Sequence, residues 1–116
     1  MATNKTASCL QEIEEEAVKI LPRNALGYYQ SGADHMVTLK SNRTAFLKYK
    51  LMPRMMIDVS KRNLTTWALG SKVTMPIGIS PTAMQRMAHP DGECASAKAA
   101  EKAGTIFILS TISTSR

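Results

Sequence analysis

The chain has 116 residues, of which 44% are hydrophobic and 21% charged, as in one ordinary soluble globular domain. Its net charge is +6, and basic residues gather between Lys40 and Arg62, which leaves open a solvated face or a nucleic-acid contact. The two cysteines, Cys9 and Cys94, form neither a disulfide framework nor a metal-ligand spacing. No stretch of the sequence is apolar and long enough to span a membrane.

The N-terminal region predicts a first amphipathic helix. Ser8 and Gln11 form the Ser-x-x-Gln pattern of a capping box, which marks a helix start. The apolar residues that follow recur at helical spacing and would share one face: Leu10, Ile13, Ala17 and Ile20.

Two further helices are predicted before residue 53. Pro22 breaks the first helix and can open the second in its first turn. The second helix is expected to stop at Gly32, since glycine commonly ends helices. A third helix is expected from Thr38, with Pro53 lying beyond its end.

The hydrophobic period changes near residue 65, and the second half predicts an α/β arrangement. Gly70-Ser71 separates two strand-like runs, at 65–69 and 72–75, which indicates a hairpin. A short apolar strand over Pro76–Ser80, a helix over Glu93–Ala103 closed by Gly104, and a second apolar strand over Thr105–Leu109 then follow. Strands that are apolar along their whole length are typical of a parallel sheet covered on both faces.

Ligands of parallel α/β proteins bind at the carboxyl ends of the strands. Two segments occupy such ends here, Pro81–Gln85 after the first strand and Ser110-Thr111 after the second. Thr82 and Ser110 are therefore candidate ligand contacts, and a role in helix capping or turn formation is the alternative for both. The two histidines have no ligand partner at helical spacing and are expected at the surface or in loops.

Several short strings follow one another along the chain in a specific order: Leu21-Pro22, Tyr28-Tyr29-Gln30-Ser31-Gly32-Ala33, Asn42-Arg43, Ala45-Phe46, Pro53-Arg54, Asp58-Val59, Met75-Pro76-Ile77, Pro81-Thr82-Ala83-Met84-Gln85, Met87-Ala88-His89-Pro90-Asp91-Gly92-Glu93 and Ala103-Gly104-Thr105. This ordered series resembles the FMN-dependent α-hydroxy-acid oxidases, the family of glycolate oxidase. The resemblance covers nearly the whole chain after its first few residues.

The resemblance implies a (β/α)₈ TIM barrel preceded by helices and a hairpin. Such a barrel needs about 250 residues, so this chain would be an N-terminal fragment with an incomplete barrel. Residues 1–64 would supply the N-terminal helices and a connection, 65–75 the hairpin, and 76–116 the first βαβ unit.

The resemblance also assigns roles to individual residues. Tyr28 resembles the tyrosine that hydrogen-bonds the substrate carboxylate, and Ser110 the serine that hydrogen-bonds the flavin ring. Pro81, Thr82 and Ala83 resemble the segment whose backbone lies against the flavin. Ile112 stands where many glycolate oxidases have a pocket aromatic residue, which leaves the preferred substrate length open. The family's histidine base, its arginines and the lysine beside the flavin would lie beyond Arg116, so no catalytic residue and no metal ligand is assigned here.

The family activity is the oxidation of a small, glycolate-like 2-hydroxy acid to the 2-oxo acid with FMN, while oxygen is reduced to hydrogen peroxide. The expected partners are that substrate and oxygen, with no nucleic acid and no membrane, and a full-length member is expected to be a homo-oligomer. A full-length member is expected in the peroxisome, whereas this chain shows no such signal and would be cytoplasmic. The alternative is a truncated, catalytically inactive fragment.

Overall fold

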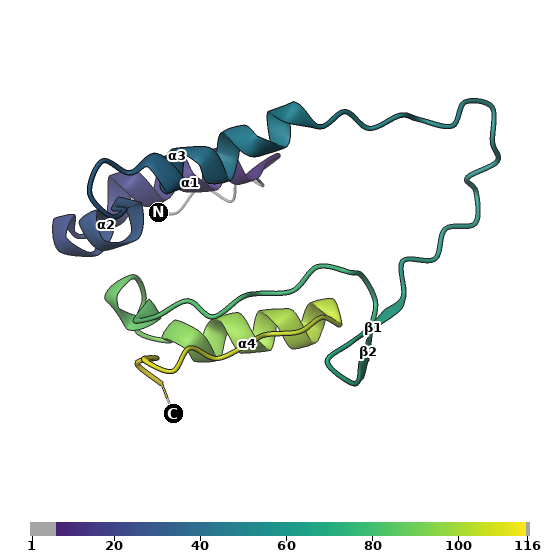
Figure 1. Ribbon diagram of the computed structural model, residues 1–116. Coiled ribbons are helices and arrows are strands. Elements are labelled where there is room, and N and C mark those ends of the chain that lie inside the picture. The colour runs from purple at the N-terminus through teal and green to yellow at the C-terminus, as the bar shows by residue number, and fades with distance from the viewer. Residues whose placement is uncertain (1–6, 116) are drawn as a thin grey trace. The chain divides into compact units, whose positions relative to one another are not determined.

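The computed structural model describes residues 7–115. The chain divides into two compact units, within Met1–Leu51 and Met52–Arg116. The first unit is built from helices, and the second holds a hairpin, two extended segments and one long helix (Figure 1). Among residues 7–115, no helix combines the length and the apolar character needed to cross a bilayer.

Helix α1 spans Leu10–Ile20 and begins one residue later than the capping-box pattern predicts. Its N-cap is Cys9, which makes no side-chain cap bond. Glu12 therefore occupies the third helical position, and the backbone N–H of Ser8 donates to its Oε2 at 3.0 Å. The predicted capping box of Ser8 with Gln11 is wrong. Because the helix begins one residue later, the Glu12 side chain, not that of Gln11, accepts a backbone N–H ahead of the helix.

Helix α2 spans Arg23–Gln30, with Pro22 as its N-cap residue rather than inside its first turn. The helix ends before Gly32, the predicted stop. Ser31 leaves the helix in an extended conformation, and its hydroxyl donates to the carbonyl of Tyr28 at 3.1 Å. This local side-chain bond satisfies one of the carbonyls at the helix end, so no left-handed glycine is needed there.

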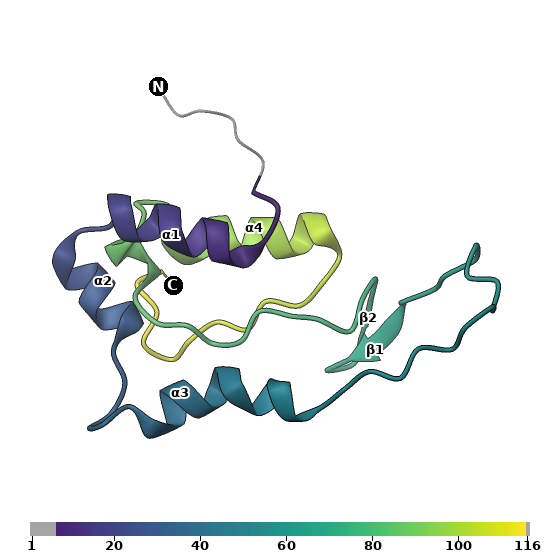
Figure 2. The ribbon, with the colours of Figure 1, turned by 90° about the horizontal axis from the view of Figure 1, so that it is seen from above.

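Helix α3 spans Val37–Thr44, one residue ahead of the predicted start, and continues into the 3₁₀ helix η1 at Ala45–Lys48. Figure 2 shows α1 and α3 as the two arms of a U that α2 closes.

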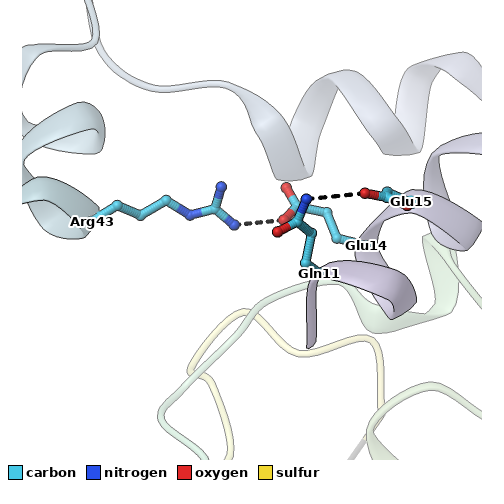
Figure 3. Close-up of polar contacts among 4 residues, drawn as sticks. All are labelled: Gln11, Glu14, Glu15 and Arg43. Atoms are coloured by element: carbon cyan, nitrogen blue, oxygen red, sulfur yellow. Dashed lines mark hydrogen bonds and ion pairs between the residues drawn. The ribbon is translucent and has the colours of Figure 1, made fainter. Parts of the chain in front are cut away.

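An ion pair connects these two arms. The guanidinium of Arg43 lies 2.5 Å from a carboxylate oxygen of Glu14, and the Gln11 amide donates to Glu15 on the same helix at 3.1 Å (Figure 3). The Arg43 and Glu14 side chains are 79% and 44% exposed. An ion pair so open to water contributes about 1 kcal/mol at most, so it orients the arms more than it stabilises them.

The second unit opens with an antiparallel hairpin, as predicted. Strands β1 (Thr66–Ala68) and β2 (Ser71–Val73) pair with Ala68 opposite Ser71. The connecting residues are Leu69 and Gly70, with φ of 48° and 76°. Two positive φ values define a type I′ turn, in which glycine stands second. The two-residue loop is therefore Leu69-Gly70, and the predicted Gly70-Ser71 loop is wrong by one residue.

Helix α4 spans Gly92–Ala103 and confirms the predicted helix within one residue. Gly104 closes it in the left-handed conformation, with φ of 69°. A Cβ at Gly104 would lie 2.6 Å from Thr74 Cγ2, so close packing as well as backbone conformation requires glycine there. A short 3₁₀ helix, η2 (Gln85–Met87), lies ahead of α4.

The two segments predicted as parallel strands lie parallel and adjacent. Their pairing consists of a single bridge, Ile79 to Phe107. The Ile79 N–H donates to the Ile106 carbonyl at 2.8 Å, and the Ile108 N–H donates to the Ile79 carbonyl at 3.0 Å. The direction and adjacency are confirmed, but neither segment is a regular strand over its predicted length. Pro76 and Pro81 bound the first segment and have no backbone N–H to donate, so regular pairing does not extend through them.

Very few apolar side chains are buried among the described residues. Ala25 is the buried apolar residue of the first unit, and Val73 and Ala100 are those of the second. Larger apolar side chains stay open to solvent: Leu10, Ile13, Ile20, Phe46, Leu47, Trp67, Ile77, Ile79, Ile108 and Leu109. The elements are formed, but the apolar faces that helices and sheets normally bury are largely uncovered.

Candidate functional site

The bridge in the second unit sets the geometry of the predicted site. Thr82 follows Ile79 by three residues, and Ser110 follows its bridge partner Phe107 by three residues. Because the two segments run parallel, their carboxyl ends point to the same edge. The structure thus brings both candidate loops to one edge of the second unit.

The first loop, Pro81 to Ala83, is held by local hydrogen bonds. The Thr82 hydroxyl donates to the Ser80 carbonyl at 3.2 Å, and the side-chain amide of Gln85 donates to the Thr82 carbonyl at 3.3 Å. Pro81 and Thr82 are exposed and Ala83 is half-buried. The loop therefore presents small side chains and exposed backbone, which suits a planar ligand lying against it.

The second loop is a turn that begins at Ser110. The Ser110 hydroxyl oxygen accepts the Ile112 N–H at 3.3 Å, and the Ser110 carbonyl accepts the Ser113 N–H at 3.2 Å. In these contacts the Ser110 side chain acts only as an acceptor, so its hydroxyl proton is free to be donated to a ligand. The Ile112 side chain is 60% exposed beside it.

A buried carboxylate lies behind these two loops, and it was missed by the sequence analysis. Glu93, in the first turn of α4, is 1% exposed. Its Oε1 accepts the backbone N–H groups of Gln85 at 3.0 Å and of Thr114 at 2.9 Å. The Thr114 hydroxyl contacts both carboxylate oxygens, and the Ser115 hydroxyl donates to Oε2 at 2.9 Å.

These contacts decide the charge of Glu93. Burial on its own raises the pKa of this carboxyl, whereas the hydrogen bonds from Thr114 and from the Gln85 N–H lower it. The hydrogen bonds win, and the pKa of Glu93 is held well below its usual range. The carboxylate is therefore an ionised acceptor at neutral pH, not an acid or base poised for proton transfer.

Gln85 extends the network from Glu93 to the first loop. Its backbone N–H donates to Glu93, its side-chain amide N–H donates to Thr82, and its side-chain oxygen accepts the Ser96 hydroxyl at 2.6 Å. One side chain thus connects the loop, the buried carboxylate and the body of α4.

Tyr28, the predicted substrate contact, belongs to the first unit. It lies on α2, its side chain is 41% exposed, and its ring meets that of Tyr29 edge to face with centroids 5.4 Å apart. Packing against Tyr29 restricts the ring, and the residue stays partly open to solvent.

Neither histidine takes part in a catalytic arrangement in the described chain. His35 is exposed, and the Nδ1 of His89 accepts the Asp91 N–H at 3.2 Å in a surface turn. Within residues 7–115, no group of three or more His, Cys, Asp or Glu side chains is gathered to hold a metal ion.

A protein-family model described as FMN-dependent dehydrogenase matches residues 17–116. The chain belongs to this family. FMN is the cofactor that the family uses.

Curated relatives agree with this family membership. Glycolate oxidase 1 of Zea mays is 52% identical over 106 residues, which cover 91% of this chain and 29% of the maize protein. Glycolate oxidase of Spinacia oleracea is 50% identical with the same coverage. The chain therefore spans under a third of the length of these relatives.

Solved structures of hydroxy-acid enzymes resemble the chain as well. A crystal structure of mandelate oxidase matches with a TM-score of 0.89 and 31% identity over 94% of this chain and 32% of that one. An active chimera of (S)-mandelate dehydrogenase matches with a TM-score of 0.85 and 38% identity, covering 90% and 30% of the two chains. The resemblance seen in the sequence is confirmed at the level of the family.

Proposed function

We propose that this chain forms the first part of an enzyme that oxidises a small 2-hydroxy acid with FMN. The observation that supports this most directly is the pair of hydroxyl-bearing loops at one edge of the parallel segments, in a chain of an FMN-dependent family. In the complete enzyme we expect these loops to lie at the carboxyl ends of the first two strands of a (β/α)₈ barrel.

The residues of the second unit fit one side of a flavin ring. The exposed backbone of Pro81, Thr82 and Ala83 would lie against the ring, and the free hydroxyl proton of Ser110 would be donated to a ring acceptor. FMN supplies the redox chemistry when it is bound, and the protein orients it. The phosphate would be held by residues outside this chain, as the family resemblance implies.

Tyr28 is the proposed substrate contact. A phenolic hydroxyl can donate to a carboxylate, and hydrogen bonds to charged groups are stronger than those between neutral groups. In the second unit, Ile112 stands where many glycolate oxidases have an aromatic residue that lines the substrate pocket, and its side chain is smaller than that aromatic residue. The proposed substrates are therefore short 2-hydroxy acids. The smaller side chain of Ile112 would leave space for a carbon chain longer than that of glycolate.

The proposed reaction takes two electrons and two protons from the 2-hydroxy acid and passes them to oxygen. The products are the 2-oxo acid and hydrogen peroxide. For the full-length protein we also propose a homo-oligomer in the peroxisome, on the strength of the family resemblance.

A second candidate is that residues 1–116 alone have no activity. The uncovered apolar side chains of both units favour it, because a working barrel would bury such residues against further strands and helices.

The experiment is a chimera in which the 106 matched residues of maize glycolate oxidase 1 are replaced by those of this chain. We expect the purified chimera to carry FMN and to form peroxide from glycolate or lactate. A folded chimera without bound flavin would contradict the proposal. A lactate-to-glycolate preference higher than that of the maize enzyme would support the assignment of Ile112.

A further inference from the structure

We propose that Glu93 is a positioning residue that fixes the two flavin-facing loops relative to each other. This inference rests on the proposed function, since it assigns a role to Glu93 at the same FMN site. The proposed role is indirect: Glu93 would act on the flavin site through Gln85 on one side and through Thr114 on the other.

The first connection runs from Glu93 to the loop of Thr82. The carboxylate accepts the Gln85 backbone N–H at 3.0 Å, and the Gln85 amide holds the Thr82 carbonyl at 3.3 Å. The Ser96 hydroxyl fixes the other end of that amide at 2.6 Å. The loop is thus fastened to α4 through a short series of directional bonds.

The second connection runs from Glu93 to the turn of Ser110. Thr114 donates its N–H and its hydroxyl to the carboxylate, and Ser115 adds a second hydroxyl. The Ser113 hydroxyl donates to the Ser115 carbonyl at 2.6 Å, while the Ser113 N–H returns to the Ser110 carbonyl. The end of this segment is therefore fixed by the same carboxylate that fixes Gln85.

The chemistry of the network favours a carboxylate over any other side chain. An ionised carboxylate offers about four acceptor positions and no donor. The donors here come from Gln85, Thr114 and Ser115, which lie 8, 21 and 22 residues from Glu93 in the sequence. A role in stabilising the α4 dipole alone would need neither the burial nor these distant partners.

The test compares Glu93→Gln with Glu101→Gln in the maize chimera. Glu101 lies on the same helix and is exposed, so it controls for loss of one charge from α4. In Glu93→Gln the side-chain amide keeps the shape of the carboxylate. Its N–H₂ group would face N–H and hydroxyl groups that themselves donate, so hydrogen bonds would be lost. We expect the dissociation constant for FMN to rise on the order of tenfold or more in Glu93→Gln, since hydrogen bonds to a charged group are lost, and to stay unchanged in Glu101→Gln.

Amide hydrogen exchange gives a readout that does not depend on activity. The N–H groups of Gln85 and Thr114 should exchange faster in Glu93→Gln, because they lose their charged acceptor. The KM for the hydroxy acid, measured at saturating FMN, should change much less than the FMN affinity. A purely structural role would lower thermal stability and leave FMN affinity of the folded protein unchanged, and that result would overturn the inference.

A milder variant covers the case in which Glu93→Gln does not fold. Thr114→Val removes the hydroxyl that contacts both carboxylate oxygens and keeps the size of the side chain. It should weaken FMN binding, and Thr65→Val, at an exposed position outside both loops, should not. Equal FMN affinity in both variants would overturn the inference. If the parent chimera folds but binds no FMN, the proposed function itself fails, and the two failures are thereby distinguished.

Discussion

In the first unit, the family resemblance assigns a ligand contact to the Tyr28 hydroxyl, which would donate a hydrogen bond to the substrate carboxylate. In the maize chimera, Tyr28→Phe should raise the KM for the 2-hydroxy acid on the order of tenfold or more, because a hydrogen bond to a charged group contributes about 1.5–3 kcal/mol. Bound FMN should be retained. Tyr49→Phe is the matched control, since Tyr49 is 81% exposed and carries no proposed role. Equal KM values in the two variants would mean that Tyr28 serves only in packing.

Gly92 starts α4 with a φ of 45°. A Cβ there would lie 2.6 Å from Arg86 Cγ and 3.1 Å from the Arg86 backbone nitrogen. Gly92→Ala should therefore lower the free energy of unfolding of the chimera by about 1–3 kcal/mol. Gly27→Ala is the control, because nothing lies within 4 Å of a Cβ at that helical position. Chemical denaturation should find it neutral or slightly stabilised, and an equal loss in both variants would contradict the reason given.

The charge of Glu93 makes a prediction about acid stability. Its pKa is lower in the folded protein than its ordinary value of 4.5, so the carboxylate stabilises the fold fully above that pH. The contribution is lost as the pH falls from there toward the lowered folded pKa. The stability difference between the parent chimera and Glu93→Gln should therefore shrink as the pH falls below about 5. A difference that stays constant as the pH falls, measured by urea unfolding, would show that folding does not lower the pKa of Glu93.

At the scale of elements, the hairpin turn holds a residue whose replacement should stabilise the protein. Leu69 adopts a φ of 48° and is 80% exposed, so it bears the cost of a left-handed backbone without burying its side chain. Asparagine tolerates this conformation and forms the preferred Asn-Gly pair with Gly70. Leu69→Asn should raise the free energy of unfolding by about 0.5–1 kcal/mol. Leu64→Asn, at another exposed leucine, is the control and should bring no gain.

The elements that the sequence predicts well are those with local signals. Helix α4 has glycine at its end, and the hairpin has a glycine in its turn, so each was predicted within one residue. The start of α1 was misplaced because two adjacent patterns compete, Ser8 with Gln11 and Cys9 with Glu12, and only the backbone decides between them.

Long-range contacts explain what the sequence did not predict. The parallel segments are expected as full strands, but a single bridge is formed, and the prolines at 76 and 81 limit the pairing of the first segment. Glu93 reads in the sequence as an ordinary acidic residue at a helix start. Its partners Thr114 and Ser115 lie 21 and 22 residues away, so no local pattern marks it as buried. A run of serines and threonines after an apolar strand is the one signal that could have suggested a buried acceptor.

At the scale of the whole molecule, apolar surface is the dominant feature. The second unit has an open groove of about 420 Å³ whose lining includes Trp67, Ile77 and Ile106, and which does not include Thr82 or Ser110. Its parallel segments expose Ile108 and Leu109. Apolar strand edges of this kind favour association unless another element covers them. We therefore expect residues 1–116 alone to aggregate at micromolar concentration, as light scattering would show, and the chimera to stay soluble.

The central proposal is that this chain forms one side of a flavin site that other parts of the enzyme complete. The most direct measurement is flavin content and peroxide formation, made side by side on residues 1–116 and on the maize chimera, each supplied with FMN and glycolate. We expect bound flavin and peroxide for the chimera and neither for the 116-residue chain. Turnover by residues 1–116 alone at a rate comparable to the chimera would contradict it, as would a folded chimera that holds no flavin.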